Sequence, residues 1–157
     1  MKEKRTKKLI VLDLDNTLIY ASFFPLEGVR FLFHYSEYLT VYERPFARDF
    51  INKCQKGAEI VVFTTAIADY AKKVCKALEM KPKALLSRKD CAIAGDRFFK
   101  KLRKEWLDGY NEIIIVDDSP EVWDETAHQN CAFLVPERFM GKPKDAELKK
   151  MAKQLPK

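Results

Sequence analysis

The sequence predicts an α/β domain built on a mostly parallel sheet with helices on both faces. Three short apolar runs rich in β-branched residues predict buried strands: "LIVLDLD" (9–15), "EIVVFTT" (59–65) and "EIIIVDD" (112–118). Segments with helical spacing separate these runs, and strands that alternate with helices imply βαβ units. A fourth run, "CAFLV" (131–135), predicts one more strand.

Four segments between the strands have the pattern of amphipathic helices. Residues 44–55 place Phe46, Phe50 and Ile51 on one helical face, with Pro45 in the first turn. Residues 68–79 repeat apolar side chains at helical spacing: Ala71, Val74, Cys75 and Leu78. Shorter candidates are residues 100–107 and 145–155.

The segment 20–43 breaks this alternation. Two β-like stretches, "VRFLFHY" and "YLTVYE", surround Ser36 and Glu37 and predict a β-hairpin that projects after the first strand. Its aromatic residues can serve either as packing within the hairpin or as one wall of a ligand site. The gap is too short for a folded cap domain, so we expect an open site.

The length of 157 residues is typical of one domain, which we place at residues 9–157 after a basic tail at 1–8. The first eight residues and the stretch 137–157 each carry a net charge of +4, and the formal total is +6. The region between them is therefore slightly acidic, at about −2. We interpret the basic ends as solvated tails, and we do not expect nucleic-acid binding.

No apolar run approaches the length of a membrane span, and Asp13 and Asp15 interrupt the run that follows the basic start. We therefore expect neither a signal peptide nor membrane association. The four cysteines lie far apart and form no C-x-x-C pair; they are Cys54, Cys75, Cys91 and Cys131. Free thiols in a reducing compartment are expected, in the cytoplasm or, in a eukaryote, the nucleus.

Polar clusters follow three of the predicted strands. Asp13 and Asp15 end the first, and two further pairs end the others: Thr64 with Thr65, and Asp117 with Asp118. In an open α/β sheet, ligands bind at the carboxyl ends of the strands, so these groups should share one rim. Clustered carboxylates repel one another unless a cation screens them, and oxygen ligands suit Mg²⁺. Beside such a metal, one aspartate can attack phosphorus while another serves as acid and base.

The first cluster resembles a known signature. "DLDNT" (13–17) fits the D-x-D-x-T motif of the haloacid dehalogenase (HAD) superfamily, and "VVFTT", "FFKKL" and "VDDSP" follow in the order of its other motifs. From about Leu9 to Leu155 the chain is most similar to the small phosphatases that act on the carboxy-terminal domain of RNA polymerase, the NLI-interacting-factor-like branch. This resemblance implies a Rossmann-like HAD fold and a Mg²⁺ cofactor.

The resemblance also implies a role for each matched residue. Asp13 is the expected nucleophile and a metal ligand, and Asp15 is the expected acid/base, with its backbone carbonyl also facing the metal. Thr64 should hold the phosphate. Lys100, rather than its neighbour Lys101, should neutralise the phosphoaspartate.

Asp117 and Asp118 match the acidic pair at the metal, where the family often has Asp-Asn, and which of the two binds the metal directly is left open. Arg44 and Pro45 match an Arg-Pro pair of the branch. Four residues are expected on the substrate side: Thr65, Phe23, Tyr70 and Arg88.

These observations predict a monomeric, magnesium-dependent phosphatase that hydrolyses phosphomonoesters through an aspartyl-phosphate, with phosphoserine or phosphothreonine in proteins as substrate. Two alternatives remain: a phosphatase for small-molecule or nucleic-acid-end phosphates, and a catalytically silent module that binds phosphopeptides. A phospho-receiver domain is disfavoured, because the middle strand ends in "FTT" and carries no acid.

Overall fold

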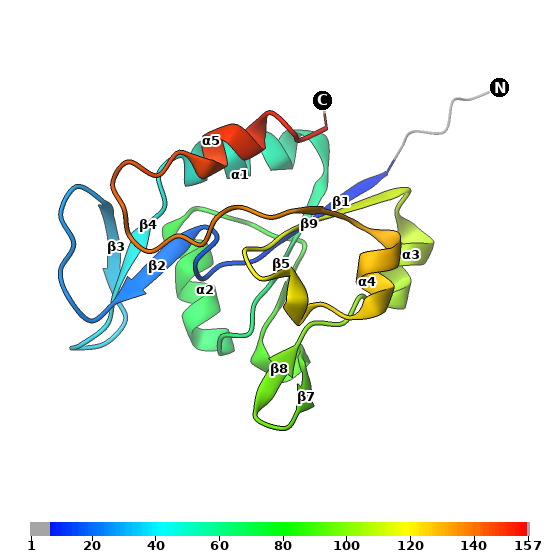
Figure 1. Cartoon of the computed structure of the whole chain (residues 1–157), viewed down its shortest axis with the longest axis horizontal. Helices are drawn as coiled ribbons and strands as arrows, with labels where there is room; N and C mark the ends of the chain where they lie inside the picture. The colour runs from blue at the N-terminus through cyan, green and yellow to red at the C-terminus, as the bar shows by residue number, and fades with distance from the viewer. Residues whose placement is uncertain (1–6, 157) are drawn as a thin grey trace.

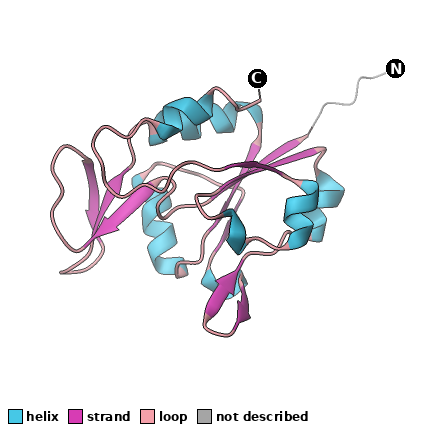
Figure 2. Ribbon diagram, in the orientation of Figure 1, coloured by secondary structure: helices cyan, strands magenta, loops and turns pink. Residues whose placement is uncertain are grey.

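A computed structural model describes residues 7–156 and contains the predicted parallel sheet (Figures 1 and 2). Its five strands are all parallel and run in the order β10-β9-β1-β5-β6. They are β1 (Lys8–Leu12), β5 (Glu59–Phe63), β6 (Ala84–Leu86), β9 (Glu112–Val116) and β10 (Ala132–Leu134). The α/β prediction is confirmed, and β1 occupies the centre of the sheet.

Helices cover both faces of this sheet, as expected. One face packs against α1 (Ala47–Gly57), α2 (Ala68–Ala77) and α5 (Glu147–Ala152), and the other against α3 (Lys104–Gly109) and α4 (Glu125–Asn130). Because successive strand residues point to opposite faces, Ile10 and Leu12 enter the first core and Leu9 and Val11 the second. A strand buried on both faces therefore needs the continuous apolar run seen in the sequence.

The predicted apolar face of residues 68–79 is confirmed, since its four apolar side chains are all buried, three of them in α2 and the fourth, Leu78, directly after its end. The predicted start of α1 was wrong. The helix begins at Ala47, Pro45 precedes it, and Phe46 adopts a left-handed conformation (φ 70°) with 41% of its surface exposed. The chain must reverse between β4 and α1, and the backbone N–H of Ala47 closes this turn on the carbonyl of Arg44 (3.1 Å).

Two small antiparallel sheets interrupt the alternation of strands and helices. The first sheet has the strand order β2-β4-β3 and consists of β2 (Ile19–Ser22), β3 (Arg30–His34) and β4 (Thr40–Glu43). Its β3–β4 hairpin is the predicted one, whereas β2 was not anticipated. The second, also unanticipated, pairs β7 (Ala92–Ala94) with β8 (Arg97–Phe99). Neither insertion forms a separate cap domain within residues 7–156.

Residues 1–6 of the predicted basic tail, together with Lys157, lie outside the described residues. Lys8 already belongs to β1, and the backbone N–H of Lys7 donates to Oδ1 of Asn111 (2.8 Å). The division into a tail and one domain from residue 9 stays a prediction. Between residues 7 and 156, no helix has the length and apolar character needed to cross a membrane. All four cysteines are free.

Candidate active site

The loop after β1 brings two carboxylates to the rim of the sheet. Between Asp13 and Asp15, the side chain of Leu14 is fully buried in the core, whereas its two neighbours line the pocket at the rim of the sheet. The chain then turns sharply, because backbone N–H groups of Thr17 and the two residues after it all donate to the carbonyl of Leu14. Asn16 takes the left-handed conformation that this turn requires (φ 66°), which asparagine tolerates better than most residues.

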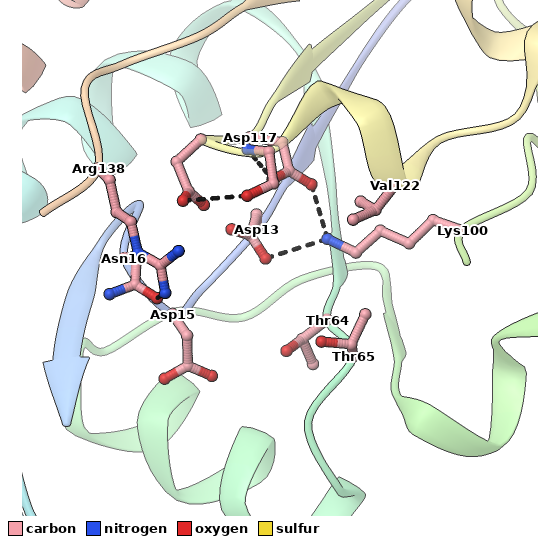
Figure 3. Close-up of a pocket in the computed structure, with 11 residues that line it drawn as sticks. Asp13, Asp15, Asn16, Thr64, Thr65, Lys100, Asp117, Val122 and Arg138 are labelled. Atoms are coloured by element: carbon pink, nitrogen blue, oxygen red, sulfur yellow. Dashed lines mark hydrogen bonds and ion pairs between the residues drawn. The ribbon is translucent and has the colours of Figure 1, made fainter. Parts of the chain in front are cut away.

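The carboxyl ends of the central strands share one pocket of about 180 Å³ (Figure 3). Its lining comprises Asp13, Asp15, Asn16, Thr64, Thr65, Lys100, Asp117, Asp118, Ser119, Val122 and Arg138. All six predicted strand-end residues are therefore brought together with Lys100, as the sheet topology required. The three other predicted substrate-side residues, Phe23, Tyr70 and Arg88, do not line this pocket.

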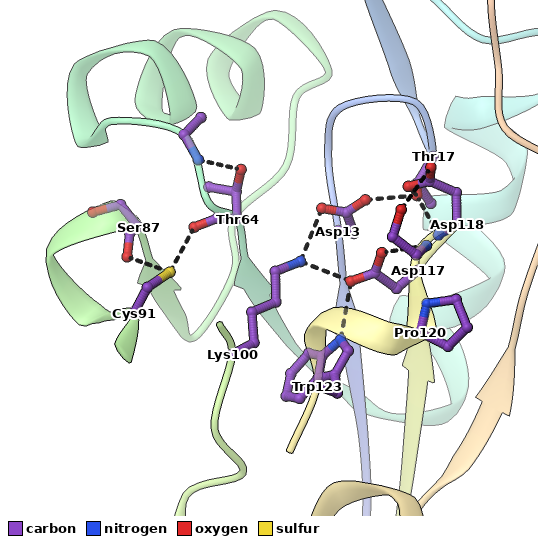
Figure 4. A network of polar contacts seen from close by, with 12 residues as sticks. Asp13, Thr17, Thr64, Ser87, Cys91, Lys100, Asp117, Asp118, Pro120 and Trp123 are labelled. Carbon is purple, nitrogen blue, oxygen red and sulfur yellow. Dashed lines mark hydrogen bonds and ion pairs between the residues drawn. The ribbon is translucent and has the colours of Figure 1, made fainter. Parts of the chain in front are cut away.

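Lys100 is buried between two of the aspartates (Figure 4). Its Nζ donates to Oδ1 of Asp13 (3.0 Å) and to Oδ2 of Asp117 (2.7 Å). Nε1 of Trp123 donates to the same Asp117 oxygen (2.9 Å). Lys101, by contrast, is exposed. Lys100 precedes α3 and pairs with Trp123 in an isolated β-bridge, which aims its side chain into the rim.

Burial dominates the electrostatics of this cluster. Desolvation raises the pKa of Asp13 to about 6, although Lys100 and a hydrogen bond from Thr17 act against it. Desolvation and the charge of Asp13 likewise raise the pKa of Asp117 to about 6. Burial also disfavours the charge of Lys100, but its two aspartate partners outweigh burial and raise its pKa above the usual value. The lysine therefore stays positively charged, and the excess charge of the cluster is negative.

The cluster has the donor set of a hard-cation site. Carboxylate oxygens of Asp13, Asp117 and Asp118 all lie within 4.8 Å of one another. Both oxygens of Asp117 already accept hydrogen bonds, because Oδ1 accepts from the backbone N–H of Ser119 (2.9 Å). Asp118 is half-buried, and within residues 7–156 its side chain contacts hydroxyl groups but no cationic side chain.

Thr17 links Asp13 to Asp118 in this cluster. Its Oγ1 accepts from the backbone N–H of Asp118 (3.0 Å) and donates to Oδ2 of Asp13 (2.7 Å). The same hydroxyl lies 3.0 Å from Oδ1 of Asp118, so its single proton can be donated to either carboxylate, and the loop after β1 is tied to the loop after β9. No role was predicted for Thr17 or Trp123, although Thr17 closes the D-x-D-x-T signature.

Tyr70 reaches the site indirectly. Its ring is buried on α2 and packs edge-on against Tyr35, with ring centroids 5.1 Å apart. Its hydroxyl donates to Oδ1 of Asp15 (2.7 Å). Burial raises the pKa of Asp15, and the hydrogen bond from Tyr70 partly offsets this effect. Tyr70 therefore orients the second aspartate of the signature.

Thr64 is buried at the end of β5, where its backbone N–H donates to the carbonyl of Leu86 (3.0 Å). Its Oγ1 accepts from the backbone N–H of Ala66 (3.0 Å), which leaves the hydroxyl proton for another acceptor. Nε of Arg88 donates to the carbonyl of Thr65 (2.9 Å), just outside the pocket. The Phe23 side chain is 75% exposed after β2.

Arg44 binds the segment that precedes α5 to the loop after β1. Its guanidinium is fully buried and makes a bidentate ion pair with Asp145, at 2.8 and 2.9 Å. It also donates to the carbonyls of Thr17 (3.0 Å) and Glu137 (2.6 Å). The Arg-Pro match singled out Arg44 in the sequence, but no pattern predicted its contacts with Thr17, Glu137 and Asp145.

A central parallel sheet, a D-x-D-x-T loop after its middle strand and an acidic rim at its carboxyl end together define a protein of the HAD fold. Similarity to solved structures supports this assignment of the fold. Fission yeast Fcp1, an RNA polymerase II CTD phosphatase, aligns with 94% of this chain and 49% of its own at 21% identity and a TM-score of 0.63. The HAD domain of the Legionella pneumophila effector Lem4 aligns with 96% of this chain and 94% of its own, at 14% identity and a TM-score of 0.51.

The family follows from the sequence match. A model of the NLI interacting factor-like phosphatase family matches residues 8–157, and the chain belongs to this family. CTD small phosphatase-like protein 1 of Caenorhabditis elegans is 30% identical over 121 residues, which cover 73% of this chain and 24% of that protein. The chain spans less than half the length of the first curated relatives that it matches.

Proposed function

We propose that this protein is a magnesium-dependent phosphatase that hydrolyses phosphoserine and phosphothreonine in proteins through an aspartyl-phosphate on Asp13. One observation carries the proposal. The carboxylate of Asp13 lies in an open pocket, where Thr17 binds one of its oxygens and Lys100 the other, and two more carboxylates lie close enough to share a cation with it.

The proposed reaction has two steps. Oδ1 or Oδ2 of Asp13 attacks phosphorus, the bond from phosphorus to the ester oxygen breaks, and Asp15 gives its proton to the departing oxygen. Asp15, now ionised, then takes a proton from water as that water attacks the phosphoaspartate. Phosphate leaves, and both aspartates return to their starting states. The raised pKa of Asp15 suits a residue that must be protonated in one step and ionised in the next.

Lys100 and the threonine hydroxyls stabilise the negative charge on the phosphoryl oxygens in this mechanism. Lys100 adjoins Asp13 and remains protonated, so its charge is fixed where negative charge gathers on the phosphoryl oxygens. The hydroxyl proton of Thr64 is available to a phosphate oxygen, and Thr65 also lines the pocket. Phosphoryl transfer depends mainly on such positioning and charge stabilisation.

Asp13 and Asp118 are the proposed side-chain ligands of Mg²⁺, with the predicted backbone carbonyl of Asp15 as a third. Asp117 is assigned a supporting role, because its two oxygens are already taken by Lys100, Trp123 and Ser119. Magnesium bound there would neutralise the acidic cluster and offset charge on the phosphoryl oxygens.

Access to the pocket supports a protein substrate. The insertions after β1 and before Lys100 are small sheets and leave the pocket uncovered, which suits an extended peptide better than an enclosed metabolite. Arg88 and the exposed Phe23 are retained as proposed contacts for flanking peptide residues. Fcp1 and the C. elegans relative carry names that refer to the CTD, and this points to the same substrate class.

The mechanism is tested with Asp13→Asn, which keeps the size of the side chain and removes its charge. Turnover of an aryl phosphate with Mg²⁺ should fall by about a thousandfold or more, whereas Asp96→Asn, an exposed control at the tip of the β7–β8 hairpin, should match the wild type. Beryllium fluoride should label Asp13 alone. Near-normal turnover by Asp13→Asn would refute the mechanism.

The substrate class is tested with a panel of phosphopeptides, nucleotides with a terminal phosphate, and sugar phosphates. We expect the highest kcat/KM for a phosphopeptide. A sugar phosphate or nucleotide far above every peptide would establish the small-molecule alternative. Phosphopeptide binding without any turnover would establish the silent module.

A further inference from the structure

Arg138 is a cation at the pocket that the mechanism does not use. It lies in the loop between β10 and α5, its side chain is exposed, and it lines the pocket (Figure 3). The only other cation of the lining is Lys100, which two aspartates already hold. Among residues 7–156, Arg138 has no carboxylate partner, and Nη2 donates to the neutral Oδ1 of Asn16 (3.2 Å). Most of its five N–H donors remain available.

The backbone that carries Arg138 is anchored on both sides. Before it, the carbonyl of Glu137 accepts from Arg44 (2.6 Å). After it, the backbone N–H of Phe139 donates to the carbonyl of Asn16 (2.8 Å), and Nδ2 of Asn16 donates back to the carbonyl of Phe139 (3.0 Å). The guanidinium thus extends from a fixed point beside the loop after β1, and its hydrogen bond to Asn16 orients it.

The place of Arg138 indicates which part of a substrate it meets. Asn16, its partner, directly follows Asp15, and Asp15 is the residue proposed to protonate the departing oxygen. This edge of the pocket therefore faces the leaving group, the part in which one phosphomonoester differs from another. Lys100 lies with Asp13 and Asp117, among the groups that handle phosphate (Figure 4).

We infer that Arg138 binds an anionic side chain of the substrate beside the target residue, and so selects phosphopeptides with acidic neighbours. The planar guanidinium matches a carboxylate or a phosphate with two parallel hydrogen bonds. Four aspartates line the same pocket and would repel such a peptide, so Arg138 supplies the attraction that an acidic flank needs. The inference rests on the proposed function.

The test uses three peptides that share one phosphoserine and differ only in its flanking residues: glutamine, glutamate, or a second phosphoserine blocked from turnover as a phosphonate. We expect wild-type kcat/KM to be highest for one of the two anionic flanks, and the better one identifies the anion. In Arg138→Gln, the value for that peptide should fall about tenfold more than the value for the glutamine peptide. Lys142→Gln, an exposed charge change in the same loop, is the matched control and should keep the preference.

The salt dependence of the preference and direct measurements of peptide binding distinguish a contact with the flanking residue from a contact with the shared phosphate. Raising salt should reduce the wild-type preference, because the contact is exposed, and should have little effect on Arg138→Gln. An equal loss for all three peptides would place Arg138 on the shared phosphate and overturn the inference. An unchanged preference would overturn it too.

Peptide binding by Asp13→Asn, with and without Arg138→Gln, is measured by fluorescence anisotropy. If no peptide is hydrolysed, the proposed function fails, and this binding comparison alone decides the inference.

Discussion

The hydroxyl of Tyr70 donates a 2.7 Å hydrogen bond to Oδ1 of Asp15. The tyrosine comes from α2 and the aspartate from the loop after β1, so the packing of α2 positions the hydroxyl that contacts the proposed acid/base residue. Burial and the charge of Asp15 raise the pKa of Tyr70 above its usual value, which keeps the phenol protonated and donating at any working pH.

Tyr70→Phe should therefore alter the pH dependence of catalysis. The hydrogen bond stabilises ionised Asp15 and lowers its pKa, so its loss should raise that pKa further. For a substrate whose departing oxygen needs a proton, the alkaline decline of kcat/KM should move to higher pH. Profiles measured with a phosphoserine peptide check this. Tyr35→Phe is the matched control, because the hydroxyl of Tyr35 donates to Asp69 and not to Asp15. An unmoved profile would show that Tyr70 does not tune Asp15.

Replacing Lys100 should cost far more activity than replacing its neighbour. Lys100→Ala removes the charge between Asp13 and Asp117, and we expect turnover to fall by about a hundredfold or more. Lys101 is exposed, so Lys101→Ala should stay within about twofold of the wild type. Steady-state kinetics with an aryl phosphate, together with melting curves, distinguish loss of catalysis from loss of fold. The reverse ranking would contradict the assignment of Lys100.

The choice between Asp117 and Asp118 as metal ligand can be tested by magnesium binding. We expect Mg²⁺ to raise the melting temperature of the wild type. Asp118→Ala should abolish this rise, whereas Asp118→Asn should keep much of it because an amide oxygen can also bind the ion. Asp117→Ala frees Lys100 and Trp123, so it should lower turnover more than magnesium affinity. Loss of the magnesium effect in Asp117→Ala alone would reverse the assignment.

The ion pair of Arg44 with Asp145 should be a major contribution to stability. Asp145→Ala leaves a fully buried guanidinium without its partner, and we expect the free energy of unfolding to drop by about 3 kcal/mol. Asp108→Ala, on the exposed side of α3, should change it by no more than about 0.5 kcal/mol. Urea denaturation followed by circular dichroism measures both. Equal values for the two variants would contradict a structural role for the pair.

The parallel sheet was predictable because its signal is local. A strand covered on both faces, such as β1, needs an unbroken apolar run, and such runs are visible without knowledge of the fold. The start of α1 was not predictable, since Phe46 adopts its left-handed conformation to satisfy a chain reversal. The short strands β2, β7 and β8 were not predicted, because each spans only three or four residues and lacks the continuous apolar run of a strand in the central sheet.

For the site, the sequence by itself determined which chemistry is available. Asp13, Asp15 and the Asp117–Asp118 pair follow predicted strands, and parallel strands present their carboxyl ends at one edge, so their meeting was implied. Lys100 was assigned by resemblance, and its burial between two aspartates agrees with that assignment.

Only the tertiary structure decided how these groups are held. Arg138 and Asp145 lie in the loop between β10 and α5, more than a hundred residues from their partners Asn16 and Arg44. Such contacts depend on where the chain returns after the last strand, and hydrogen-bond geometry between distant loops leaves no mark on local composition. The same reason explains Tyr70, which the resemblance placed on the substrate side, because no local pattern could show that its hydroxyl would meet Asp15.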